Sequence, residues 1–103
     1  MIMTDFTAKA LITAHQYTVK DKMLLSEFYV EDIEIKADRL KFNDEEVYFE
    51  DIHQYRGFQD DYTILIVTEV ENYYVLVFQT GITHSIVFNK LDTTYKYWRV
   101  SLN

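Results

Sequence analysis

Residues 39–52 read RLKFNDEEVYFEDI and carry the strongest local structural signal in the chain. Apolar and polar side chains alternate on each side of an acidic turn, which is typical of a β-hairpin. A four-residue loop at 43–46 would set Phe42 opposite Val47 on the apolar side of the hairpin. A slip of one residue would turn every side chain to the wrong face, so the pattern specifies the pairing.

Strand-like segments continue towards the carboxyl end. Residues 62–68 and 73–78 are apolar on both faces and predict central strands joined by a turn near Glu71 and Asn72. Residues 82–88 and 98–102 alternate in polarity and predict two further strands. An antiparallel meander is the natural arrangement of such consecutive strands.

The amino-terminal segment fits two descriptions. Phe6, Ala10 and Ala14 have helical spacing after Thr4, whereas residues 11–19 alternate as a strand does, and the strand is favoured. The fold class expected is therefore all-β, or β-rich α+β, with one N-terminal helix as the alternative. We expect an antiparallel meander of about seven or eight strands that closes into a small barrel or sandwich.

Length and composition define the class of protein. A chain of 103 residues with 49% hydrophobic side chains predicts a single domain, 1–103. The absence of cysteine excludes disulfides and thiolate metal sites. Residues 1–6 lack the basic cluster and apolar run of a secretory signal, and the apolar stretches are far shorter than the ~20 residues of a membrane span. We therefore expect a cytoplasmic protein without a membrane partner. The abundance of Tyr, Phe, Ile and Lys, with two Gly and no Pro, is typical of a low-GC bacterium or its mobile elements.

The hairpin segment also resembles a known family. Residues 39–52, with Leu-Lys-Phe, an acidic turn and Val-Tyr-Phe-Glu-Asp-Ile, resemble the strand-turn-strand of bacterial pleckstrin-homology-like modules. Such modules end in a long amphipathic helix, and this chain departs from that pattern at Tyr95-Lys96-Tyr97-Trp98-Arg99. By periodicity alone, the end of this chain around Trp98 predicts a strand instead.

The sequence carries no catalytic signature. No serine lies in a nucleophile elbow, and the two glycines, Gly57 and Gly81, are too isolated to cradle a phosphate. His15, His53 and His84 lack the spacing of a metal site, although His53 and His84 could meet across strands beside Glu50 or Asp51. We therefore expect no enzyme activity, no cofactor and no metal.

The charge distribution is the most informative feature. Residues 27–71 contain 14 Asp and Glu against four Lys and Arg, within a net charge of −7. Exposed carboxylates with interleaved tyrosines suit docking on a basic surface. The predicted partner-binding residues are Asp44, Glu45, Glu46, Tyr48, Glu50, Asp51, Tyr55, Asp60, Asp61 and Tyr62.

Two functions follow from this map. The first is a non-catalytic inhibitor or adaptor that docks on a basic surface of a nucleic-acid-handling protein such as a nuclease. Such an inhibitor would be an anti-defence product of a phage or mobile element and would act as a nucleic-acid mimic. Glu46 and Glu50 would then project from one strand about 6.6 Å per two residues, near the phosphate spacing. The alternative is a small β-barrel that binds an apolar ligand or peptide, lipocalin-like or pleckstrin-homology-like. The negative charge disfavours direct nucleic-acid binding. The sequence also allows a homo-oligomer that forms through edge strands or exposed tyrosines.

Overall fold

The computed structural model describes residues 5–68 and 72–102, and the side chains of residues 10 and 11 are outside the description. Seven strands form one antiparallel sheet in the order β4-β3-β2-β1-β7-β6-β5, and a helix follows the last strand. The strand and helix bounds are β1 (Phe6–Thr18), β2 (Leu24–Ile35), β3 (Arg39–Phe42), β4 (Glu45–Tyr48), β5 (Ile52–Phe58), β6 (Thr63–Thr68), β7 (Asn72–Phe78) and α1 (Gly81–Ser101), with a 3₁₀ turn at Phe49–Asp51. The expected β-rich antiparallel fold is confirmed.

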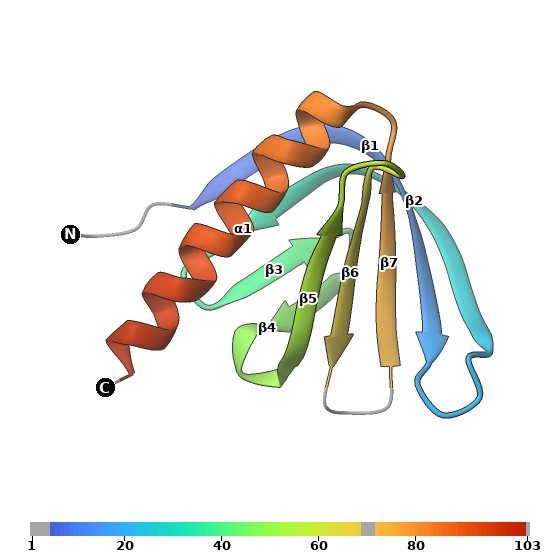
Figure 1. Cartoon of the computed structure of the whole chain (residues 1–103), viewed down its shortest axis with the longest axis horizontal. Helices are drawn as coiled ribbons and strands as arrows, with labels where there is room; N and C mark the ends of the chain where they lie inside the picture. The colour runs from blue at the N-terminus through green and yellow to red at the C-terminus, as the bar shows by residue number, and fades with distance from the viewer. Residues whose placement is uncertain (1–4, 69–71, 103) are drawn as a thin grey trace.

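The sheet bends but does not close. β4 and β5 are consecutive in the chain and stand at the two ends of the strand order, so the sheet stays open. Of the two expected arrangements, barrel or sandwich, the barrel is therefore wrong. Figure 1 shows β3 and β4 running across the direction of β5, β6 and β7, with α1 lying along the open side. The long strands β1 and β2 belong to both parts of the bent sheet.

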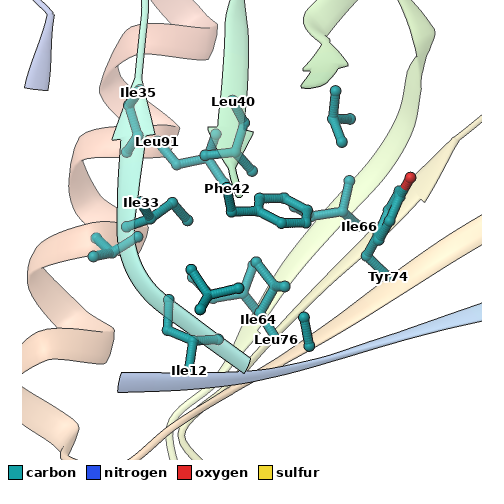
Figure 2. Packing of buried hydrophobic residues seen from close by; sticks show 14 of the residues in the cluster. Ile12, Ile33, Ile35, Leu40, Phe42, Ile64, Ile66, Tyr74, Leu76 and Leu91 are labelled. Carbon is teal, nitrogen blue, oxygen red and sulfur yellow. The ribbon is translucent and has the colours of Figure 1, made fainter. Parts of the chain in front are cut away.

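The core lies between the concave face of the sheet and α1. Figure 2 shows Phe42 at its centre, with Ile33 and Ile35 of β2 on one side and Ile66 of β6 on the other. All four side chains are at most 1% exposed. Burial at alternate positions along these strands explains the two-residue periodicity of the sequence.

The N-terminal segment is a strand, so the helix considered there is wrong. β1 pairs with β2 through Phe6 to Tyr17 and with β7 through Ile12 to Thr18. A strand that has neighbours on both sides gains two ladders of backbone hydrogen bonds, which outweighs the helical spacing of three apolar residues.

The carboxyl end is a helix, so the two strands expected at 82–88 and 98–102 are wrong. Thr80 caps α1 by accepting a hydrogen bond from the Thr83 backbone N–H at 3.2 Å. The buried side chains recur at helical spacing and are His84, Val87, Leu91 and Thr94. A long C-terminal helix is the feature in which this chain was expected to depart from pleckstrin-homology-like modules, and that expectation is wrong.

The hairpin register also differs from the expectation. Phe42 pairs with Glu45 and Leu40 pairs with Val47 around a two-residue turn at Asn43 and Asp44. Asn43 has a φ of 53°, which asparagine tolerates, and its side-chain amide donates to the Tyr29 carbonyl at 2.8 Å. The tight turn therefore replaces the four-residue loop.

The link between β6 and β7 was expected to turn near Glu71 and Asn72. Asn72 begins β7, and residues 69–71 lie outside the described part of the chain.

Candidate functional site

The structure places nine of the ten predicted partner-binding residues at the two ends of β5 and the tenth, Tyr55, within that strand. One group surrounds the β3–β4 hairpin and the 3₁₀ turn, and the other lies in the turn between β5 and β6. Seven residues of extended strand separate them, which corresponds to roughly 20 Å. The ten residues therefore do not form one continuous face.

Arginine neutralises part of the hairpin group. The Arg39 side chain lies 3.5 Å from the Glu46 carboxylate and 2.9 Å from that of Asp38, and its guanidinium lies over the Tyr48 ring. Tyr48 donates a hydrogen bond to Glu46 at 3.2 Å, and the neighbouring carboxylate raises the pKa of Tyr48. Glu46 and Tyr48 are thus engaged within the hairpin.

Glu45 is held by the sheet itself. Its carboxylate accepts a hydrogen bond at 3.1 Å from the hydroxyl of Tyr74 on β7. Tyr74 is 7% exposed, and its burial raises its pKa to about 12. This contact connects the hairpin to the other half of the bent sheet, which is a structural role.

Glu50 and Asp51 do not continue the strand of Glu46. β4 ends at Tyr48, and the next three residues form a 3₁₀ turn that buries Phe49. The expected 6.6 Å repeat of carboxylates is therefore wrong here, because the chain turns in order to insert the Phe49 ring into the core. Glu50 instead borders a hollow of about 180 Å³ together with Asp38, Tyr48 and Trp98.

Tyr55 points towards the helix and not towards solvent. Its hydroxyl donates to Asp92 at 2.5 Å, and its ring lies 4.9 Å from that of Tyr95 and 6.0 Å from that of Phe88. Burial, followed by the Asp92 hydrogen bond, raises the pKa of Tyr55 well above its usual value, while the same bond lowers the pKa of Asp92. Tyr55 therefore holds α1 against β5, and its side chain is only partly exposed.

The second group borders a wide, open depression of the described surface. Asp60 and Tyr62 line an open groove of about 920 Å³ between the β5–β6 turn and the start of α1, and exposed Asp61 lies between them in the chain. The other lining residues are Gln59, Gln79, Thr80, Gly81, Ile82, Ser85 and Ile86. The groove thus combines predicted residues with helical ones that were not predicted.

Two backbone features shape this groove. Tyr62 has a φ of 51°, and its carbonyl accepts from the Phe78 N–H at 2.8 Å, which fixes the turn against β7. A Cβ at Gly81 would lie 3.1 Å from the Tyr62 ring, so the glycine lets the ring sit over the beginning of α1.

The groove presents apolar side chains to solvent. Ile82 is 75% exposed and Ile86 is 49% exposed, one helical turn apart, and Tyr62, which also lines the groove, is 41% exposed. Isolated apolar residues are common on surfaces, but a cluster in a concave site marks a binding surface. The spacing of four residues between Ile82 and Ile86 could have indicated this helical surface in the sequence. The alternation of Ile82, Ile86 and Phe88 with other residues favoured a strand instead.

The depression continues along β5. A hollow of about 270 Å³ shares Gln59 and Ser85 with the main groove and is also lined by Gly57, His84, Phe88 and Asn89. A Cβ at Gly57 would lie 2.9 Å from the Phe88 ring, so this glycine lets the helix approach β5 closely. The two hollows form one groove between α1 and β5, an end strand of the sheet; below, "the β5–α1 groove" means this surface.

The histidines do not form a metal site in the described part of the chain. His84 is 3% exposed on α1, and its Nε2 lies 2.9 Å from the Thr63 carbonyl, which requires Nε2 to be the donor. His15 contacts Glu27 at 3.2 Å on the opposite face of the sheet, and His53 is exposed at the start of β5. Across residues 5–68 and 72–102, no group of three His, Cys, Asp or Glu side chains could hold a metal ion.

Comparison with known proteins adds no relative. No family model, curated protein or solved structure matches the chain. Among the described residues, no helix has the length and apolar character needed to cross a membrane.

Proposed function

We propose that this chain is a non-catalytic protein-binding module whose β5–α1 groove takes up an extended, basic segment of a partner protein. The observation that carries the proposal is the groove itself, which joins the end strand β5 at Gly57, an exposed apolar wall and the carboxylate of Asp60, next to exposed Asp61 in the chain. The three components match three properties of such a segment: its backbone, its apolar side chains and its charge.

The backbone component is the free side of β5. β5 pairs with β6 through Ile52 to Phe58, and no other described strand lies on its second side. An extended segment can add to such an edge through main-chain hydrogen bonds, which supply affinity without selecting a sequence.

The apolar component selects a side chain. Ile82, Ile86 and Tyr62 line the groove together, and all three keep a large exposed fraction. Covering them with one aliphatic or aromatic side chain of the partner removes apolar surface from water at about 25 cal/mol per Å². A bound segment therefore needs at least one large apolar residue.

The charge component selects a basic partner. Asp60 lines the groove beside Asp61, and no lysine or arginine is among the residues that line its two hollows. The net charge of −7 steers a basic partner towards the molecule. Nucleic-acid-handling proteins carry basic segments of this kind, which keeps them the partner class that we propose.

A peptide display library tests the proposal. The wild-type chain should enrich sequences that combine a large apolar residue with lysine or arginine, and binding should weaken as salt rises. Ile86→Asp should abolish this enrichment, and Asp60→Lys with Asp61→Lys should remove the basic preference. The control is Val100→Asp, which changes a side chain that is 71% exposed near the other end of the same helix. Equal enrichment by wild type and Ile86→Asp would refute the groove as the binding site.

A further inference from the structure

The convex face of the sheet carries a second surface that is independent of the groove. Side chains at alternate positions of three neighbouring strands point away from α1: Thr13, His15 and Tyr17 of β1, Tyr73, Val75 and Val77 of β7, and Thr63, Leu65 and Val67 of β6. All nine are partly exposed, and none is Asp, Glu, Lys or Arg. In a chain with 26% charged residues, this face is unusually apolar.

Residue pairing aligns this face into rows that cross five strands. One row runs from Glu27 on β2 through His15, Val75 and Leu65 to Arg56 on β5. β7 is the central strand of the five, so Glu27 and Arg56 lie two strands away on opposite sides, each about 10 Å from β7. The row thus has an acidic end, where Glu27 contacts His15 of the same chain at 3.2 Å, an apolar middle at Val75 and Leu65, and a basic end.

The neighbouring row crosses the same five strands and has an aromatic residue at each end. It runs from Tyr29 on β2 through Thr13, Val77 and Thr63 to Phe58 on β5. Tyr29 is 76% exposed and Phe58 is 38% exposed, with Arg56 lying 5.4 Å from the Phe58 ring centre.

We propose that this convex face is the interface of a symmetric homodimer, with the two-fold axis parallel to β7 and passing over Val75. Rotation about that axis places β5 of one copy over β2 of the other. Arg56 then meets Glu27 of the second copy, Phe58 meets its Tyr29, and each contact occurs twice because the interface is isologous. Sheets packed face to face in this way keep their strands nearly aligned.

The occupant follows from the order of the charges. This face has a negative charge, Glu27, at one border and a positive charge, Arg56, at the other, so a partner of a single charge sign would be repelled at one of them. A second copy rotated about β7 presents the complementary sign at each border and an apolar centre against an apolar centre. The surface is therefore complementary to itself.

The size of the face indicates a weak dimer. Two rows and the adjoining third give about fifteen positions, each covering about 4.8 by 6.8 Å of sheet, or roughly 500 Å² in each copy. Stable interfaces bury about 800 Å² per partner. Association should therefore be observed only in concentrated solution.

A charge swap followed by sedimentation equilibrium up to about 1 mM protein tests the proposal. Glu27→Arg alone and Arg56→Glu alone should each raise the dimer dissociation constant about tenfold or more, because two contacts turn repulsive in each dimer. The double variant should restore dissociation to near the wild-type value. Glu50→Arg, on the exposed 3₁₀ turn, is the matched control and should leave the dissociation constant within about twofold.

A cross-linking experiment locates the axis. The chain has no cysteine, so Val75→Cys introduces a single thiol beside the proposed axis, and a short bismaleimide should link two copies through it. Val100→Cys at the end of α1 should give far less dimer. A wild-type chain that stays monomeric at every concentration would overturn the proposal, and so would a dimer that the charge swap leaves unchanged.

Discussion

Replacing Phe49 by alanine should remove the support of the carboxyl half of α1. The Phe49 ring is 1% exposed and meets the rings of Tyr95 and Trp98 edge-on, with centroids 5.5 and 5.9 Å away. Truncating a buried phenylalanine costs about 3–5 kcal/mol of unfolding free energy. A domain of this size has a total stability of about 5–15 kcal/mol, so the loss is a large fraction of it.

Urea unfolding measures this loss directly. Trp98 is the only tryptophan, so its fluorescence reports the helix contact without interference. With a slope of about 2 kcal/mol per molar urea, the midpoint should fall by about 2 M. Val100→Ala, which changes a residue that is 71% exposed on the same helix, should shift stability by less than about 0.5 kcal/mol. A loss below about 1 kcal/mol in Phe49→Ala would refute the view that α1 rests on the 3₁₀ turn.

Three further predictions concern the β5–α1 contact and the buried tyrosines. Gly57→Ala places a methyl group 2.9 Å from the Phe88 ring and should lower thermal stability by about 1–3 kcal/mol; an unchanged melting temperature would show that the helix lies further from β5. Tyr55→Phe removes the hydrogen bond that lowers the pKa of Asp92 and should reduce the free energy of unfolding by about 1–2 kcal/mol at neutral pH. This loss should become smaller as acid protonates the Asp92 carboxylate, which unfolding experiments at pH 7 and pH 3 measure. Because the folded protein raises the pKa of Tyr74 to about 12, the unfolded chain ionises first, and stability should fall between pH ~10 and ~12, less steeply in Tyr74→Phe; equal slopes would contradict it.

The strand content could be predicted because burial follows the two-residue period closely. Ile64 and Ile66 are fully buried, while Leu65 between them faces outward and is partly exposed. The sequence showed apolar residues on both faces of β6 and β7, but not that only one of these faces belongs to the core. That distinction depends on where α1 lies, which is a long-range property.

The helix was missed because one segment satisfies two periodicities. Ile82, Ile86 and Phe88 alternate as they would in a strand. The residues that the helix buries are instead Val87 and Leu91, together with the polar residues His84 and Thr94 on the same side of the helix. A helical stripe that includes histidine and threonine gives a weak hydrophobic signal. Once the segment is helical, Ile82 and Ile86 stand on the groove wall, so the error in secondary structure also concealed half of the candidate site.

The acidic residues show the limit of a charge count. The sequence identified Asp60 and Asp61 correctly as exposed, but Glu45 and Glu46 are held by Tyr74 and Arg39. A carboxylate that already has a partner within the fold contributes less to an external contact. Which carboxylates have such partners depends on the register of the β3–β4 hairpin, and the predicted hairpin loop was two residues longer than the observed turn.

The most direct test of the account is an amide NMR titration of the isotopically labelled chain with a basic, apolar peptide taken from the display library. We expect the largest shifts along the β5–α1 groove, at residues 54–60 of β5 and its turn and at residues 81–89 of α1, and none of that size at the β3–β4 hairpin. Shifts concentrated at residues 43–51, with the groove unperturbed, would contradict the central claim and move the binding surface to the other acidic group.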